Sequence, residues 1–563
     1  MLDKNYDTVE VEDALVSPTQ HALDKHGWRS FITGVFHKLA KQTLLFCIFI
    51  FLCALGLNLY RLGTPSIWFD EALSISRAQQ PLSLLYQIVS RSQPNMTLYY
   101  FFLHFWLSFM AFWGLPPNEF VVRLPSAIFA ASGSVMVFLL GRRFLGLSAG
   151  FTAAILYLLN DLQLVYTQDA RAYSMQLLLL CVSWYAFFAI VTAETPRTRW
   201  WICYVTVAAL TVYAQLFSFF VLLAQFSMFA LLLILPGPWR ATLHKQGRTL
   251  MISAVSFFVL VIPMLLASRA GAKTGWLPIP HLHDIYYFFL TISEGGKPAL
   301  LLNLLCILGS LSLGLLLYLP GSKHLLERLS QRLPGKAKGI TKVQITWAIA
   351  IALALWVIVP VVISYVVSQK SVHVFSSRYL VVILPAFFLL IGLGVALIRQ
   401  PFVRVLLILC LFLIALQHVP TYYASAQVEN WKPAAHWLEQ RYHQNDGMVC
   451  YDNSEGCQVV MGYYLRLDTD GDIDFASDSP GAFHGIDYDV INHTPGTYRA
   501  AVDPQALQVY GTKHPRLFFI TARIAPKDAQ LSAAHQWLST HYTLIEQVVT
   551  HTVTIRLYLT NMT

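Results

Sequence analysis

The chain has 563 residues, of which 56% are hydrophobic and 12% are charged, and its formal net charge is +9. Soluble domains carry roughly 25% charged residues, so this composition excludes an ordinary soluble protein and indicates an integral membrane protein. The basic residues cluster in short segments between apolar runs, which favours cytoplasmic loops over nucleic-acid binding.

The first 43 residues form a polar segment that opens with five acidic side chains between Asp3 and Asp13. This segment lacks the basic start and the small-residue cleavage site of a signal peptide. Residues 1–43 are therefore predicted to form a cytoplasmic tail, with Lys38 and Lys41 flanking the first apolar run on its inner side.

Eleven apolar runs are long enough to cross a bilayer, which takes roughly 17–25 residues each. They predict a polytopic α-helical membrane domain over residues 44–424. The runs lie near residues 44–60, 120–140, 147–166, 174–193, 200–216, 217–235, 249–267, 298–319, 344–367, 379–398 and 402–419.

A twelfth run, residues 97–114, decides which side of the membrane every later loop faces. If it does not span, fifteen basic residues of the later loops lie inside and seven lie outside, as the positive-inside rule prefers. Its Tyr, His and Trp side chains suit a helix that lies in the membrane interface. The run is predicted to be interfacial or re-entrant within one external loop, residues 61–119, and an ordinary span is the alternative.

The composition changes after the last run, from about residue 420. Asp, Asn and Gly become frequent, and short apolar strands appear at 517–521 and 553–559. Residues 425–563 are predicted to form a small extracytoplasmic α/β or α+β domain. The same topology brings four charged residues to the external side, namely Asp70, Asp169, Arg171 and Arg378.

The eight cysteines match no metal-binding pattern, and six of them lie in apolar runs, where Cys is an ordinary buried hydrophobe. Cys450 and Cys457 are seven residues apart in the polar C-terminal region. A disulfide between them is possible if that region lies outside the cytoplasm.

The acidic pair Asp70 and Glu71 follows the first span in a chain that is otherwise poor in charge. Carboxylates at a membrane surface are costly unless they react or bind something. Adjacent residues point about 100° apart on a helix, so this pair alone cannot form a two-carboxylate glycosidase site. One carboxylate can act as a general base while the other caps a helix or pairs with a cation, and helix capping by both is the alternative.

Two arginines at the external ends of spans are candidates for binding a phosphate group. Arg171 follows Asp169 near the end of the third span, and Arg378 precedes Tyr379 at the start of the tenth. The planar fork of donors on arginine suits a phosphate, although an interfacial ion pair would also explain these residues. Asn95 can hydrogen-bond a sugar or belong to a turn before the next helix.

A metal site is not expected, because His281, His283 and Asp284 match no standard ligand spacing. A divalent metal as a cofactor is left open. No phosphate-cradling glycine-rich loop occurs, so no nucleotide site is expected.

Several short motifs resemble those of the GT-C glycosyltransferases, especially the bacterial relatives of protein O-mannosyltransferases and of the lipid A aminoarabinose transferase. The resemblance covers roughly residues 44–440. Its motifs are residues 68–72, 94–100 with His104 and Trp106, 123–127, 166–174, 378–379 with Pro385, and 430–435. Many relatives have His-Pro-Pro where this chain has Gln93-Pro94-Asn95.

The resemblance implies a GT-C fold and an inverting glycosyltransferase of the bacterial plasma membrane and cell envelope. The implied donor is a polyprenyl-phosphate sugar, and the acceptor is an unidentified glycan, lipid or protein. The implied base is Asp70, beside Glu71 and with Asp169 as the second acidic position. The predicted substrate-binding residues are Arg171, Tyr173, Arg378, Tyr379, Asn95 and Tyr99.

Two other functions remain compatible with a polytopic chain. A transporter or flippase of lipid-linked sugars predicts charged residues near mid-span and a repeat between halves, and neither is evident here. A non-catalytic membrane assembly subunit predicts that Asp70→Asn leaves function unchanged.

Overall fold

The computed structural model describes residues 42–561 apart from several short stretches. The stretches outside the described residues are 92, 196, 236, 269–273, 276, 320–321, 332, 335–336, 338, 371, 426–428, 453–456, 469–471, 477–478, 481–503 and 523–528. The predicted tail, residues 1–43, lies outside the described residues except for its last two positions. The chain divides into two compact units, residues 1–50 and 51–563, and the described part of the first is helical.

Among the described residues, eight helical segments are long and apolar enough to cross a membrane, and two bent helix pairs raise the total to ten. The eight are Gln42–Leu59, α5 (Glu119–Phe144), α8 (Tyr173–Val191), α12 (Gly247–Ala267), α14 with α15 (Gly296–Leu311 and Leu313–Tyr318), α17 (Gly339–Ser368), the segment Ser377–Leu397 and α20 (Pro401–Ser425). The pairs are α6 (Leu147–Leu159) with α7 (Asp161–Thr167), and α10 (Ser218–Ile234) with α11 (Pro238–Lys245).

All eleven predicted runs are helical, which confirms the polytopic α-helical fold class. The run at 200–216 corresponds to α9 (Thr198–Ala214), a helix of 17 residues that is not among these ten candidate spans. The segment Ser377–Leu397 contains α18 (Ser377–Leu380), η2 (Val381–Ile383) and α19 (Leu384–Leu397). It is the most enclosed of the candidate spans: 89% of its 18-residue apolar stretch is buried, against 17% of that of α20, so it forms the centre of the bundle.

The loop predicted to be external, residues 61–119, contains three short helices, α2 (Phe69–Ala78), α3 (Leu82–Arg91) and α4 (Thr97–Phe112). The 16 residues of α4 rise about 24 Å, which is less than the roughly 30 Å of a bilayer core. One face of α4 is buried through Tyr99 and Leu103, while Phe105 and Phe109 are exposed. The helix therefore has the one-sided burial of an interfacial helix.

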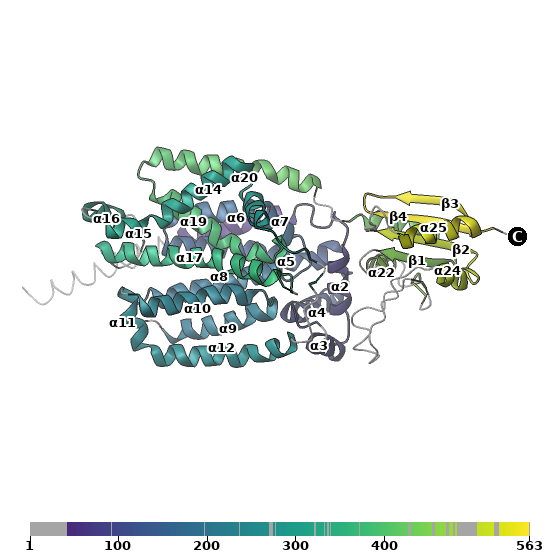
Figure 1. The fold of residues 1–563 in the computed structure, drawn as a ribbon, viewed down its shortest axis with the longest axis horizontal. Helices are drawn as coiled ribbons and strands as arrows, with labels where there is room; N and C mark the ends of the chain where they lie inside the picture. The colour runs from purple at the N-terminus through teal and green to yellow at the C-terminus, as the bar shows by residue number, and fades with distance from the viewer. Residues whose placement is uncertain are drawn as a thin grey trace, which may run out of the picture. The chain divides into compact units, whose positions relative to one another are not determined.

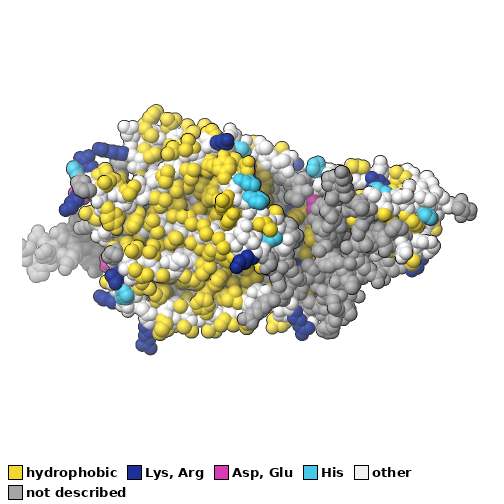
Figure 2. Space-filling model, viewed as in Figure 1, with side chains coloured by type: hydrophobic (Ala, Val, Ile, Leu, Met, Phe, Trp, Pro, Cys, Tyr) yellow, Lys and Arg dark blue, Asp and Glu magenta, His cyan; other side chains and the backbone are white. Residues whose placement is uncertain are grey.

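The two ends of the helical bundle differ in structure and in charge. Figure 1 shows α2, α3 and α4 at one end and α11 and α16 (Lys323–Ser330) at the other. Figure 2 shows a broad hydrophobic band over the bundle, with Lys and Arg side chains gathered at the end that carries α11 and α16. Such a band is the surface expected to face lipid tails.

The C-terminal region folds around a four-stranded mixed sheet of order β1-β2-β4-β3. β1 (Gly447–Asp452) pairs in parallel with β2 (Arg516–Ala522), and β4 (Val553–Thr560) is antiparallel to both β2 and β3 (Tyr542–Val549). Helices cover both faces: α21 (Trp431–Glu439) and α22 (Cys457–Asp468) on one, and α24 (Pro504–Gly511) and α25 (Ala529–His541) on the other. Alternate residues of β2, such as Phe518 and Phe519, enter different cores, as the two-residue period of a strand requires.

This C-terminal region shares a hydrophobic core with the loop of residues 61–119. Ile67, Tyr99, Trp431 and Tyr464 are all buried in one cluster, which also contains residues of the sheet. Within the region, Cys450 and Cys457 form a disulfide. The loop that carries the acidic pair therefore packs against both the C-terminal region and the helical bundle.

Candidate active site

The acidic pair occupies the first turn of α2, with Trp68 at the N-cap. The backbone N–H of Trp68 donates to the Glu71 carboxylate at 3.4 Å, so Glu71 caps the helix. Acidic side chains are favoured there because the N-terminal N–H groups are unpaired and positive. Since neighbouring residues point about 100° apart, Asp70 and Glu71 face different partners.

Glu71 is fully buried and forms an ion pair with Arg123 of α5. Arg123 Nε donates to Glu71 Oε1 at 2.7 Å, and its Nη2 donates to Glu71 Oε2 at 2.6 Å. The backbone N–H of Ala170 also donates to Glu71 Oε1, at 2.8 Å. Both carboxylate oxygens are thus engaged, and this arrangement favours a structural role for Glu71 over the catalytic role predicted from the sequence.

The remaining donors of Arg123 fix the segment that leads into α2. They bond the carbonyl oxygens of Leu62, Pro65 and Ser66 at distances from 2.8 to 3.1 Å. Arg123 is only 2% exposed, so a buried guanidinium with all its contacts made holds this segment in one conformation. Asp70 therefore lies at the start of a helix whose preceding segment is fixed by Arg123.

Asp70 lies between two arginines. Its Oδ2 is 3.2 Å from Arg378 Nη1 and 3.7 Å from Arg171 Nη2. The three side chains are 19%, 24% and 12% exposed, so they line a partly open site and are not part of the closed core. The structure therefore brings together residues from the first loop, the α7–α8 connection and the start of the central span.

Arg171 is further anchored to α2 by hydrogen bonds from its Nη1 to the Asp70 carbonyl oxygen and to Ser74 Oγ, at 3.2 and 3.1 Å. Its Nε is buried and has no hydrogen-bond partner among the residues that the structure describes. A buried donor without a partner is costly, and it can be satisfied by an anionic ligand.

Trp68 connects Asp169 to the arginines. Its indole N–H donates to Asp169 Oδ1 at 3.2 Å, and the Arg378 guanidinium lies over its ring at 5.8 Å from the centroid. Asp169 is 4% exposed, and burial together with the nearby Glu71 carboxylate raises the pKa of Asp169 well above its usual value. Asp169 is thus a buried carboxyl that orients Trp68, beside the open site and not within it.

Two pairs of aromatic side chains lie in the segments that carry Arg171 and Arg378. Tyr173 packs on Tyr166 with ring centroids 4.5 Å apart, and Tyr379 stacks on Phe217 at 5.5 Å. Tyr173 and Tyr379 flank the two arginines in sequence, at Arg171 and Arg378, so the predicted tyrosines do gather near the arginines.

Two other predicted substrate-binding residues are used for packing. Asn95 Oδ1 accepts a hydrogen bond from the backbone N–H of Leu216 at 3.0 Å, which ties the start of α4 to the α9–α10 connection. Tyr99 is fully buried in the core shared with the C-terminal region. These contacts favour structural roles for Asn95 and Tyr99.

His281 and Asp284 form a helix cap. The backbone N–H of His281 donates to Asp284 Oδ2 at 2.7 Å at the start of α13 (Leu282–Ser293). In the described part of the chain, no group of three or more His, Cys, Asp and Glu side chains is arranged to hold a metal ion.

Most of the chain is similar in structure to ArnT from Cupriavidus metallidurans. In the apo state of ArnT the TM-score is 0.55, with 13% sequence identity over 91% of this chain and 97% of ArnT. For ArnT bound to undecaprenyl phosphate the TM-score is 0.50, with 12% identity over the same shares. Residues 92–266 match the family model described as dolichyl-phosphate-mannose-protein mannosyltransferase, whereas no curated protein matches the sequence significantly. The chain therefore has the GT-C fold, and the resemblance drawn from its motifs is confirmed.

Proposed function

We propose that this protein is an inverting glycosyltransferase that moves a sugar from a polyprenyl-phosphate donor to an acceptor outside the cytoplasm. The observation that carries the proposal is the Asp70 carboxylate, which is partly exposed and is shared by Arg171 and Arg378. The match of residues 92–266 to a family that uses dolichyl-phosphate-mannose, and the fold shared with a protein that binds undecaprenyl phosphate, support it.

The two arginines are the proposed binding site for the donor phosphate. They lie at the external ends of spans, where the head of a membrane-anchored lipid would be, and arginine binds phosphate through paired donors. Arg171 Nε adds a buried donor that no described residue satisfies. The lipid tail would then lie along the hydrophobic band of the bundle.

Phosphate binding also changes the state of Asp70. Without donor, the Asp70 carboxylate is held in ion pairs with Arg171 and Arg378. A donor phosphate that takes over these guanidinium groups releases the Asp70 carboxylate from both ion pairs. In this scheme, donor binding itself prepares the base.

Asp70 then accepts the proton of the acceptor hydroxyl as the hydroxyl oxygen attacks C1 of the sugar. The bond from C1 to the phosphate oxygen breaks on the opposite face, so the anomeric configuration inverts. The electron pair leaves with polyprenyl phosphate, whose added negative charge is stabilised by Arg171 and Arg378. Asp169 and Glu71 act as positioning residues through Trp68 and Arg123.

The decisive experiment measures sugar transfer in membranes supplied with radiolabelled polyprenyl-phosphate hexoses and pentoses. The wild type is expected to transfer label with inversion, and Asp70→Asn to lose about 10²–10⁴-fold in rate. Asp472→Asn is the matched control, because Asp472 is an exposed carboxylate of the C-terminal region. Equal transfer by wild type and Asp70→Asn would overturn the role of Asp70.

A further inference from the structure

A basic and aromatic cluster lies far from Asp70, at the other end of the bundle. α5 begins beside the acidic pair, where Arg123 binds Glu71, and its 26 residues rise about 39 Å. Gly146, two residues after α5, lies close to Pro334 in the segment after α16, since a Cβ at Gly146 would be 3.9 Å from Pro334 Cδ. The end of α5 is therefore at the end of the bundle that carries α16 (Figure 1).

Arg143, in the last turn of α5, is surrounded by aromatic rings. Its guanidinium carbon lies 5.2 Å from the ring centroid of Phe144, 5.0 Å from that of Tyr185 and 5.5 Å from that of Trp200. Arg143 Nη1 also donates to the Tyr185 hydroxyl oxygen at 2.6 Å. A guanidinium that stacks on rings is held in one place and keeps the donors in its plane for an anion. Arg143 is exposed, so an anion can reach it.

A second cation lies over the same tryptophan. The Arg199 guanidinium is 5.3 Å from the ring centroid of Trp200, and Arg199 is also exposed. In the described part of the chain, neither Arg143 nor Arg199 forms an ion pair, and the exposed Glu194 between α8 and α9 forms none with them. Two like charges near one ring repel each other, and a bound anion would relieve that repulsion.

The cluster borders the surface that faces lipid. Ile202 of α9 is 63% exposed and Leu147 at the start of α6 is 48% exposed, so outward-facing apolar side chains flank the two arginines on the neighbouring elements. Tyrosine and tryptophan beside basic side chains are typical of the membrane interface, where lipid headgroups lie. The surroundings therefore favour the phosphate of a lipid as the anion.

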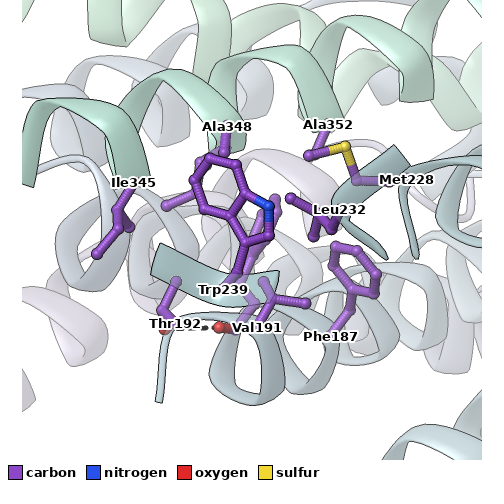
Figure 3. Close-up of a pocket in the computed structure, with 11 residues that line it drawn as sticks. Phe187, Val191, Thr192, Met228, Leu232, Trp239, Ile345, Ala348 and Ala352 are labelled. Carbon is purple, nitrogen blue, oxygen red and sulfur yellow. Dashed lines mark hydrogen bonds between the residues drawn. The ribbon is translucent and has the colours of Figure 1, made fainter. Parts of the chain in front are cut away.

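The opposite side of α8 is closed by packing. Phe187 lies two residues after Tyr185 and points about 160° away from it around the helix. Figure 3 shows Phe187, Leu232 of α10 and the indole of Trp239 of α11 around a crevice with room for about one water molecule. Trp239 is 7% exposed, so α11 closes that side. A ligand can thus approach α8 only from the Tyr185 side, where Arg143 lies.

We propose that Arg143, with Arg199 beside it, binds the phosphate of an anionic phospholipid in the leaflet at this end of the bundle. Arg143 donates through the N–H groups that the Tyr185 hydroxyl does not use, and Arg199 adds positive charge. The rings of Tyr185 and Trp200 lie at the level of the headgroup, and the acyl chains stay in the bilayer. The site is separate from the donor site, because the full length of α5 lies between them.

Native mass spectrometry of the purified full-length protein tests the proposal, with dioleoyl phosphatidylglycerol and the phosphatidylcholine of the same chains as probes. The wild type is expected to retain one phosphatidylglycerol and to prefer it to phosphatidylcholine about fivefold. Arg143→Gln should abolish this preference. Arg240→Gln is the matched control, because it removes the same charge from an exposed position of α11, outside the aromatic cluster, and should keep the preference.

Arg143→Lys gives a second, milder test. It keeps the charge and loses the planar group, so its preference should lie between those of the wild type and Arg143→Gln. Three results would overturn the proposal: a preference unchanged in Arg143→Gln, an equal loss in Arg143→Gln and Arg240→Gln, or release of the bound phosphatidylglycerol by inorganic phosphate. The second would show a general effect of charge, and the third would assign the site to a free anion.

Discussion

The Asp70 carboxylate and the Arg378 guanidinium lie 3.2 Å apart, although 308 residues separate them in the chain. One belongs to α2, and the other to the start of the most enclosed span. In the proposed mechanism, the donor phosphate competes with Asp70 for the Arg378 guanidinium. Donor binding and release of the Asp70 carboxylate would then be coupled through this one contact, and the coupling can be measured.

Arg378→Gln should therefore affect donor binding more than Arg378→Lys. Removing the charge loses a charge-assisted hydrogen bond to phosphate of about 2 kcal/mol, which corresponds to a rise in donor KM of roughly 30-fold. Lysine keeps the charge but loses the planar fork, so its KM should lie between those of the wild type and Arg378→Gln. Steady-state transfer at varied donor concentration measures this order, and an unchanged donor KM in Arg378→Gln would remove Arg378 from the phosphate site.

Glu71→Gln should reduce stability, in contrast to Asp70→Asn. The substitution leaves the buried Arg123 guanidinium without its anion, which costs about 3–5 kcal/mol. Asp70 is partly exposed, so its loss should leave the melting temperature close to that of the wild type. Thermal unfolding in detergent measures both variants, and Glu71→Gln with Arg123→Met should recover part of the loss because no buried charge remains unpaired.

The spans could be predicted because the length of an apolar run decides whether a helix crosses a bilayer. The 65° bend between α6 and α7 was not predicted, because it depends on a local hydrogen bond inside an apolar run. Asn160 at the break caps α7 by accepting from the backbone N–H of Gln163 at 3.4 Å. A single Asn in the run 147–166 changes its hydropathy too little to mark a break.

Part of the candidate site followed from topology alone. The distribution of basic residues among the loops was enough to predict that four charged residues lie on one side of the membrane, namely Asp70, Asp169, Arg171 and Arg378. In the structure they lie close together. The different roles of Asp70 and Glu71 could not be predicted from the sequence. They depend on the contact between Glu71 and Arg123, which are 52 residues apart in the chain. The signal for it was Arg123 itself, a charge in an apolar segment that requires an anionic partner.

The buried Glu294 should make stability depend on pH. It accepts from Asn160 Nδ2 at 2.8 Å and from the backbone N–H of Asp161 at 2.5 Å, and burial raises the pKa of Glu294 to about 9. The folded state therefore binds more protons than the unfolded state between about pH 4.5 and 9, so this group lowers stability as pH rises through that window. The melting temperature of Glu294→Gln relative to the wild type should increase from pH 5 to pH 9, and a constant difference would contradict the raised pKa.

The disulfide between Cys450 and Cys457 should be present in protein taken from intact membranes if the C-terminal region lies outside the cytoplasm. Alkylation with a maleimide before and after reduction counts the thiols that reduction releases. Two additional thiols are expected in the wild type and none in Cys450→Ser with Cys457→Ser. Free thiols at both positions without reductant would place this region in a reducing compartment and contradict the proposed orientation.

Tyr464 of the C-terminal region contacts the segment before α2, and through this contact the region should influence the rate of sugar transfer. Its hydroxyl accepts from the backbone N–H of Ile67 at 2.6 Å, immediately before α2, and lies 3.3 Å from Glu119 Oε1. Tyr464→Phe leaves the Ile67 N–H unpaired and should destabilise the native position of α2 by about 1–3 kcal/mol. Because Asp70 begins that helix, we expect kcat to fall roughly tenfold while donor KM changes little.

Tyr463→Phe provides the matched control, since the Tyr463 hydroxyl donates to the carbonyl oxygen of Pro117 at 2.7 Å and not to the segment before α2. It removes the same group from the neighbouring position of α22 and should leave kcat within about twofold of the wild type. If both variants lower kcat equally, the C-terminal region supports the fold in general, and Tyr464 has no specific part in positioning Asp70. If only Tyr464→Phe lowers kcat, the contact with Ile67 is the link between the α/β region and the base.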